Sequence, residues 1–435
     1  MSTNLIRSGI AAMAVKLSAA GLSYLMFVVL ARWLGADDYG QYASAFSAGT
    51  FLSYVMLAGL NSEILRRLPA LEGDSGSSGA RRVFLATALR GQALALLVVG
   101  AIGMLVALAA YVLGSAGWGK MILLAIGFGA ALALAEFLAS VFRALGAVNI
   151  ALVPRDMLWR ILLIGTVAGL AALGTSPSLA LAATLSIVLL LLSLAVQILA
   201  GRRLLPPKGD TSSKTQITEQ TTPRGLIWDA RWLAVAALAS NLLQPLGVVV
   251  VGAVLSYSDS GLFFAAQRTA ALLSLPLLAM NMIGAPQIAR AWSKSGTQEV
   301  QRICTHIALV ASAGTAVGFL IVLGLSGQLL GIFNPAYSDG GLVLIILAFG
   351  NMLNSLAGAS GNVMMMTGHA RQLVFLSAIG QGSGLVLVLL GGYFWSIEGA
   401  AIGEALGILI VNAAIIVWAR SKLKIDPSVL SIVRK

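Results

Sequence analysis

Four ionisable side chains lie well inside long apolar runs of this sequence: those of Lys16, Glu136, Arg268 and Glu404. A charged side chain at the centre of a bilayer costs about 2.5–3.5 kcal/mol on insertion scales, and it usually faces the interior of a helical bundle or a cavity. At helical spacing, each of the four shares a face with glycine, alanine or serine instead of leucine. Such faces indicate either a polar cavity or a close helix–helix interface in which the charge is paired.

Two pairs of amide side chains also interrupt apolar runs, and the members of each pair are three residues apart: Asn241 with Gln244, and Asn351 with Asn354. Residues at this spacing lie on one side of a helix, so each pair presents its donors and acceptors together. These amides could hydrogen-bond to the hydroxyl groups of a polar cargo. They could equally well hydrogen-bond to neighbouring helices and link them inside the membrane.

The elements that must position these side chains are membrane-spanning helices. Of the 435 residues, 58% are hydrophobic and 10% are charged, and the mean hydropathy is +0.92. A helix needs about 20 apolar residues to cross a bilayer. The apolar runs predict an all-α integral membrane protein with twelve spans, at residues 8–33, 41–60, 86–113, 121–143, 153–173, 178–200, 232–255, 261–288, 305–328, 341–366, 372–394 and 398–419.

The gaps between the predicted spans alternate in charge. One set carries nearly all of the lysines and arginines, whereas the other set carries almost none. Because cationic loops stay in the cytoplasm, both termini are predicted to be cytoplasmic. The first apolar run is too long for a signal-peptide core, so we expect it to remain as the first span. The net charge of +12 is thereby explained by topology, and no nucleic-acid partner is needed.

A long polar gap divides the chain. It predicts an N-terminal lobe of six spans at residues 1–201, a cytoplasmic linker at 202–231, a C-terminal lobe of six spans at 232–420, and a cytoplasmic tail at 421–435. A shift of 221 residues lays "LGADDYGQYASA" over "LSYSDSGLFFAA" and matches Gly40 with Gly261. With an even number of spans in each lobe, the two lobes have the same orientation in the membrane.

The first copy of this repeat follows the first span and reads "ARWLGADDYGQY". Aspartate and glycine predict a tight turn outside the membrane. The aromatic residues Trp33, Tyr39 and Tyr42 are expected to anchor that turn at the membrane interface.

Four motifs in register with the spans resemble those of a known family: "ARWLGADDYGQYASAF", "SDSGLFFAAQRTAAL", "MMMTGHARQ" and "IEGAAIGEALG". They are similar to the corresponding places in Wzx-like polysaccharide flippases of the multidrug/oligosaccharidyl-lipid/polysaccharide (MOP) exporter superfamily. The resemblance implies two six-helix lobes around a central cavity. It also implies alternating access, in which an undecaprenyl-diphosphate-linked oligosaccharide moves from the cytoplasmic to the outer leaflet of the bacterial inner membrane.

That resemblance gives the polar residues their expected roles. Lys16 and Arg268 are predicted to bind the diphosphate, and the amides Asn241, Gln244, Asn351 and Asn354 the sugar hydroxyls. Glu136 or Glu404 is predicted to carry an exchanged H⁺ or Na⁺, with a permanent internal ion pair as the alternative. No other cofactor is expected. The implied partners are the lipid-linked oligosaccharide, membrane lipids, and the polymerase and export machinery of O-antigen, lipopolysaccharide, capsule or exopolysaccharide synthesis.

Signals for catalysis are weak. His306 and His369 are far apart in the chain, and the single cysteine, Cys304, excludes an intramolecular disulfide and any multi-cysteine metal site. A polytopic glycan polymerase or ligase would usually need a large outer loop, but every predicted outer gap is short. The sequence therefore favours a transporter over an enzyme. A drug or organic-cation exporter of the same superfamily remains the second transport hypothesis.

The alternating charges generate a topology prediction. In a Cys304→Ser background, an impermeant thiol reagent added outside the cell should label single cysteines at Ser258 and Ser396, but should not label one at Ser213. Strong labelling at Ser213 from outside would contradict the predicted orientation.

Overall fold

The computed structural model describes residues 3–71, 77–204, 222–294 and 296–432. Every regular element within these residues is helical. In chain order the elements are α1 (Thr3–Leu34), α2 (Ala36–Leu57), α3 (Leu60–Arg67), η1 (Pro69–Leu71), α4 (Ser77–Val112), α5 (Ala116–Ala144), α6 (Val148–Val153), η2 (Pro154–Leu158), α7 (Trp159–Ala172), α8 (Leu179–Gly201), α9 (Pro223–Ser240), α10 (Leu243–Val254), α11 (Tyr257–Ala271), η4 (Leu272–Ser274), α12 (Leu275–Lys294), α13 (Thr297–Gly331), η5 (Pro335–Gly340), α14 (Gly341–Leu356), α15 (Ser360–Met366), α16 (Ala370–Lys422) and η6 (Val429–Ile432).

Eight helical segments in the described residues are long and apolar enough to cross a membrane, and two bent pairs, α2 with α3 and α9 with α10, raise this number to ten. Two more spans emerge from the geometry of the remaining elements. The elements α6, η2 and α7 form one helical run, in which the missing N–H of Pro154 coincides with a π-helical turn. The other span comes from α16, which is two helices.

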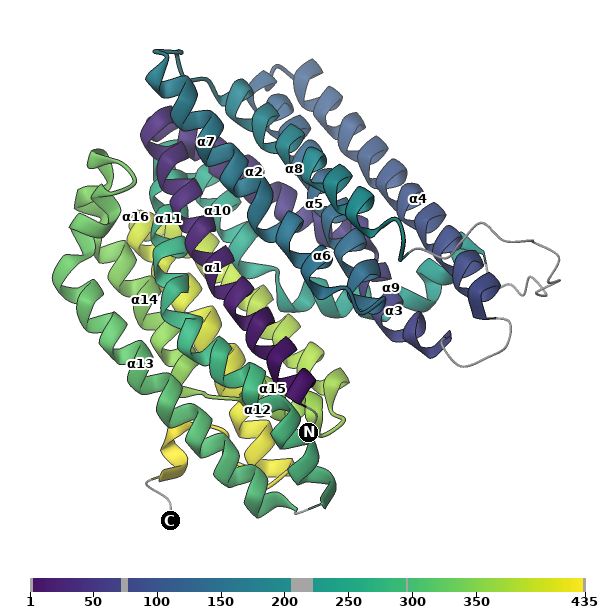
Figure 1. The fold of residues 1–435 in the computed structure, drawn as a ribbon. Helices are drawn as coiled ribbons and strands as arrows, with labels where there is room; N and C mark the ends of the chain where they lie inside the picture. Colours follow the sequence, from purple (N-terminus) through teal and green to yellow (C-terminus); the bar gives the residue numbers. More distant parts are fainter. Residues whose placement is uncertain (1–2, 72–76, 205–221, 295, 433–435) are drawn as a thin grey trace. The chain divides into compact units, whose positions relative to one another are not determined.

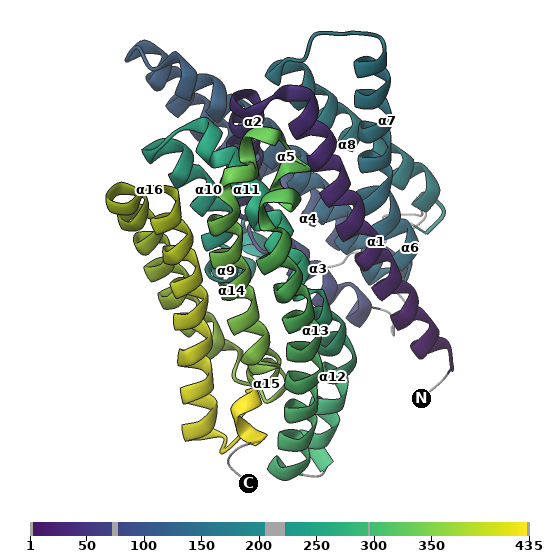
Figure 2. The ribbon, with the colours of Figure 1, turned by 90° about the vertical axis from the view of Figure 1, so that its left-hand side faces the viewer.

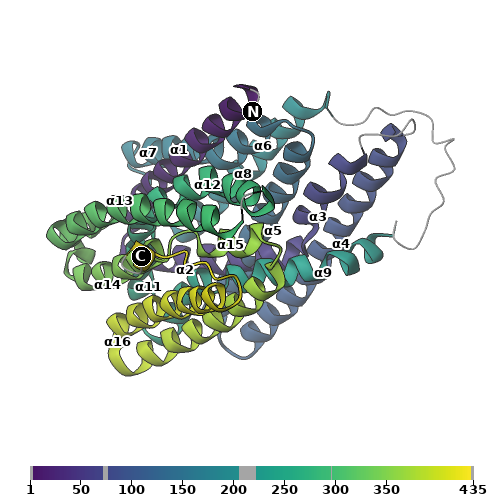
Figure 3. The same cartoon turned by 90° about the horizontal axis from the view of Figure 1, so that it is seen from below.

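Helix α16 turns back on itself. Its backbone is non-helical at Trp395 and Ser396, and Ser396 has a positive φ of 60°. A Cβ atom added to Gly384 would come within 2.8 Å of the Cα atom of Gly407, so the two arms lie in close contact. Figures 2 and 3 show these arms side by side. Small residues at the contact let the two backbones approach, and the two arms correspond to the last two predicted spans.

The described chain forms two compact units. Unit 1 comprises residues 1–26 and 45–238, and unit 2 comprises residues 27–44 and 239–435. In unit 1, α5 packs against α3, α4 and α8. In unit 2, α13 packs against α12 and α14, and α14 packs against α16 (Figure 1). The units differ from the predicted lobes in two stretches: residues 27–44 group with unit 2, and residues 232–238 group with unit 1.

The segment predicted as a linker is helical at its end. Helix α9 begins at Pro223, whereas residues 205–221 of the predicted linker lie outside the described residues. Arg67 of α3 donates to the Asp229 carboxylate over 2.9 Å and also pairs with the buried Glu63. The Arg67–Asp229 ion pair, together with the buried side chain of Leu226, holds the start of α9 against α3.

The stretch "ARWLGADDYGQY" forms a packed turn. Gly35 has a φ of +80° and ends α1, and Arg32 Nε donates to the carbonyl oxygen of Ile332 over 2.6 Å at the end of α13. The side chains of Tyr39 and Tyr42 are fully buried. The prediction that these two tyrosines anchor the membrane interface was therefore wrong, because both side chains lie inside the protein, where the ring of Tyr39 packs against Phe264 of α11.

The two glycines matched by the repeat touch each other. A Cβ atom on Gly261 would come within 3.1 Å of the Cα atom of Gly40, and a Cβ atom on Gly40 would overlap the carbonyl of Tyr257. Beside them, the hydroxyl oxygens of Ser44 and Ser260 are 2.6 Å apart. The absence of side chains at both glycines therefore allows α2 and α11 to cross at contact distance.

This crossing generates a stability prediction. Gly40→Ala should destabilise the protein by about 1–3 kcal/mol, because the new methyl group has to displace the backbone of Tyr257. Gly21→Ala on α1 is the matched control, since a Cβ atom there meets nothing within 4 Å. Thermal unfolding in detergent measures both variants. Equal unfolding temperatures for Gly40→Ala and Gly21→Ala would contradict the close crossing.

Candidate functional site

A buried carboxylate lies at the centre of a polar cluster in unit 2. Glu404, on the second arm of α16, is only 2% exposed. Gln267 Nε2, from α11, donates to Glu404 Oε1 over 3.0 Å and to Oε2 over 2.8 Å. The same nitrogen donates to the carbonyl oxygen of Gln244 on α10 over 3.1 Å. Three helices therefore meet at one amide group.

The neighbouring residue on α11, Arg268, completes the cluster. Its guanidinium carbon lies 4.5 Å from the ring centroid of Phe264 and 5.6 Å from that of Phe27. The two rings pack edge to face, with their centroids 4.8 Å apart. Arg268 also interacts electrostatically with Glu404. A half-buried cation thus lies beside two aromatic rings and within the electrostatic influence of a carboxylate.

Small residues make room for this arrangement. A Cβ atom on Gly247 of α10 would come within 3.3 Å of Glu404 Oε2, so a side chain there would crowd the carboxylate. Gly384 and Gly407 hold the two arms of α16 together, one turn away from Glu404. The position of the carboxylate therefore depends on the close packing of α10 and both arms of α16.

The second predicted carboxylate, Glu136, lies in unit 1 in a different environment. Arg143 Nη2 approaches Glu136 Oε1 at 2.6 Å, and Arg155 Nη2 approaches Glu136 Oε2 at 2.6 Å. Arg143 also donates to Ser140, which in turn donates to the backbone oxygen of Glu136 over 2.9 Å. Both oxygens of Glu136 are therefore engaged by guanidinium groups. This is the arrangement that the alternative of an internal ion pair predicts.

The first amide pair lies at a break between helices. Pro245 has no N–H group to donate to the carbonyl oxygen of Asn241, and the chain bends by 57° between α9 and α10. Gln381 of α16 spans this break: its Oε1 accepts from the N–H of Leu243 over 2.9 Å, and its Nε2 donates to the carbonyl oxygen of Ser240 over 3.3 Å. The predicted residues Asn241 and Gln244 both have exposed side chains here.

The second amide pair links helices. Asn351 Oδ1 accepts from the Ser274 hydroxyl over 2.7 Å. Asn354 Oδ1 accepts from Asn412 Nδ2 over 3.0 Å, and Asn412 Oδ1 accepts from the Ser360 hydroxyl over 3.3 Å. These bonds connect α14 with η4, α15 and α16, which corresponds to the helix-linking role considered for the pair.

Of the predicted site residues, the structure brings Arg268 and Glu404 into one cluster, together with the backbone of Gln244. Lys16 lies on the part of α1 that belongs to unit 1, and its side chain is exposed. Sequence reasoning missed Gln267 and Gln381. Both are polar residues within otherwise apolar helices, which is a weak signal, because a neutral amide in a span is as common in packing as in binding.

Comparisons with known proteins identify the family and the fold. The family model described as "Polysaccharide biosynthesis protein" matches residues 5–292. An inward-facing multidrug resistance MATE family transporter of the MOP superfamily has a TM-score of 0.68 at 16% identity, with 95% of this chain and 98% of the other covered. The lipid II flippase MurJ, in an inward closed conformation, has a TM-score of 0.67 at 15% identity, with 98% and 91% covered.

An outward-facing MATE transporter of the same superfamily has a TM-score of 0.65 at 12% identity, with 96% of this chain and 95% of the other covered. No curated protein matches the chain significantly by sequence. The all-α membrane fold predicted from the sequence is confirmed.

Proposed function

Because this chain belongs to the polysaccharide biosynthesis protein family, we propose that it is a flippase for lipid-linked oligosaccharides. Its cargo is an oligosaccharide joined through a diphosphate to undecaprenol, which it moves from the cytoplasmic to the outer leaflet by alternating access. The pathway it serves makes a polysaccharide such as O-antigen, capsule or exopolysaccharide. The protein lies in the bacterial inner membrane with both termini in the cytoplasm, and it passes its cargo to a polymerase and export machinery.

The observation that carries this proposal is the half-buried guanidinium of Arg268. A cation at this depth is costly unless an anion or an aromatic face compensates it. Phe264 and Phe27 stabilise the guanidinium, and Glu404 supplies an opposite charge that is already bonded to Gln267. A planar guanidinium can bind a phosphate group through two parallel hydrogen bonds. Arg268 is therefore suited to hold the diphosphate of the cargo.

The same cluster could couple cargo binding to the uptake of a cation. When an anion binds Arg268, the attraction between Arg268 and Glu404 weakens, and the carboxylate gains affinity for a cation. Proton or Na⁺ uptake by Glu404 would then accompany cargo binding, and cation release would accompany its loss. Glu136 is less suited to this task, because two arginines already neutralise it.

The fold supports a transporter over an enzyme, since structures with this fold include proteins named as transporters and as a flippase. Export of a drug or organic cation is the second candidate, and the likeness to MATE transporters favours it. The two candidates differ in the charge of the cargo. Purified protein in liposomes that moves a cationic dye, but not a labelled lipid-linked glycan, would replace the flippase proposal with the exporter.

Substitution of Arg268 tests the diphosphate site. Arg268→Ala should lower glycan flipping at normal protein levels by at least about tenfold, because a charge-assisted hydrogen bond contributes about 1.5–3 kcal/mol. Arg268→Lys should restore it only in part, since lysine lacks the planar fork. Lys16→Ala tests the second proposed cation in the same assay. Arg290→Ala, near the end of α12, removes an exposed arginine outside the cluster and serves as the control. Wild-type flipping by Lys16→Ala/Arg268→Ala would eliminate the proposed site.

Substitution of the carboxylates tests coupling. In liposomes, an imposed pH or Na⁺ gradient should accelerate flipping by the wild-type protein. Glu404→Gln should abolish this acceleration, because the amide carries no charge to neutralise, whereas Glu136→Gln should retain it. Flipping rates with and without the gradient give the comparison. A wild-type gradient response in both variants would show that neither residue is the coupling site.

A further inference from the structure

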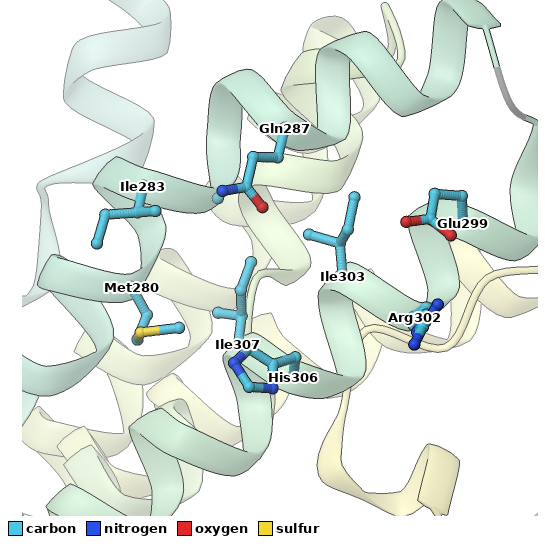
Figure 4. Close-up of a pocket in the computed structure, with 9 residues that line it drawn as sticks. Met280, Ile283, Gln287, Glu299, Arg302, Ile303, His306 and Ile307 are labelled. Atoms are coloured by element: carbon cyan, nitrogen blue, oxygen red, sulfur yellow. The ribbon is translucent and has the colours of Figure 1, made fainter. Parts of the chain in front are cut away.

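An open groove with a volume of about 340 Å³ lies between α12 and α13 in unit 2 (Figure 4). This volume falls within the usual range of sites for small ligands, about 300–1,000 Å³. The floor of the groove contains Gly284, where an added Cβ atom would come within 3.1 Å of Ile307 Cγ1. A larger residue at Gly284 would therefore fill the bottom of the groove.

One end of the groove is apolar. Met280 and Ile283 of α12 line it, and Ile303 and Ile307 of α13 continue the apolar surface. Ile283 is 51% exposed. Met280 and Ile283 on α12 and Ile307 on α13 lie farther from the α12–α13 turn than Glu299 and Arg302 do, whereas Ile303 directly follows Arg302 (Figure 4). Since the turn is predicted to be cytoplasmic, Met280, Ile283 and Ile307 lie deeper in the membrane than Glu299 and Arg302.

The other end of the groove is charged. Glu299 and Arg302 lie one turn apart on α13, next to the α12–α13 turn, and His306 follows one turn later (Figure 4). Within the part of the chain that the structure describes, none of these three side chains takes part in a hydrogen bond or an ion pair. A carboxylate and a guanidinium are thus both available to one ligand at the level of the cytoplasmic headgroups.

We propose that this groove binds an aminophospholipid from the cytoplasmic leaflet. The lipid phosphate accepts hydrogen bonds from Arg302 and His306, while its ammonium group donates to Glu299. The acyl chains lie along the apolar end of the groove and cover the exposed side chain of Ile283. Charge complementarity selects this occupant: a zwitterionic headgroup matches one cation and one anion, whereas the anionic headgroup of phosphatidylglycerol leaves Glu299 facing a negative charge.

Native mass spectrometry of the delipidated full chain tests this site, with phosphatidylethanolamine and phosphatidylglycerol as probes. The wild-type protein should retain phosphatidylethanolamine with about tenfold preference over phosphatidylglycerol. Arg302→Ala should lower phosphatidylethanolamine binding by about tenfold, because it removes the phosphate ligand. Glu299→Gln should remove the preference between the two lipids. Ile283→Trp should reduce binding of both by filling the exposed apolar end.

Arg290→Ala is the matched control, since Arg290 is also exposed on α12 but does not line the groove. Its lipid binding should equal that of the wild-type protein. The four substitutions are at exposed positions, and an unchanged unfolding temperature in detergent shows that each variant is folded. Equal retention of the two lipids by the wild-type protein would overturn the proposal, as would a loss in Arg290→Ala that equals the loss in Arg302→Ala.

Discussion

Every polar group within a bilayer has to find its partner inside the protein, because the hydrocarbon offers none. This constraint explains why the described spans are helices and why their interruptions are bridged by side chains. At the break between α9 and α10, Gln381 satisfies one N–H group and one carbonyl group that the helix leaves open. At the end of α13, Arg32 Nε donates a hydrogen bond to the carbonyl oxygen of Ile332. Each of these two interruptions is therefore tied to a particular polar residue on another element.

The two deep carboxylates, Glu136 and Glu404, meet this constraint with different partners. Glu136 has one arginine at each oxygen, at 2.6 Å in both cases. One of these arginines, Arg155, also lies 3.5 Å from Asp156. Glu404 instead receives two bonds from a neutral amide and shares the field of a single, aromatic-stacked arginine. Glu136 would keep an arginine partner if one of the two were removed, whereas Glu404 has a neutral amide as its hydrogen-bond partner. The proposal that Glu404 is the coupling residue rests on this difference.

Close contact between helix backbones is the second feature that determines the geometry around Arg268 and Glu404. In a membrane, helices associate through close packing and not through the hydrophobic effect, so positions without side chains set the helix crossings. Gly40 and Gly261 fix the crossing of α2 and α11, and Gly384 and Gly407 join the arms of α16. Gly247 of α10 lies against both Glu404 of α16 and Phe263 of α11, so its lack of a side chain allows the elements that carry Glu404 and Arg268 to approach each other.

The sequence by itself determined the spans, including those that proline, glycine or a sharp turn interrupts, because hydropathy and helical periodicity are local properties. It also identified the deep charges and the repeat that brings Gly40 against Gly261. Only the tertiary structure decided which partner each polar group takes. Gln267 and Glu404 are 137 residues apart in the chain, and no local pattern relates them. Tyr39 and Tyr42 are amphipathic aromatic residues of the kind that anchor a membrane interface, yet both are buried, and Tyr39 packs against Phe264 of α11. Burial and pairing depend on contacts between distant segments, and a local pattern carries no information about those contacts.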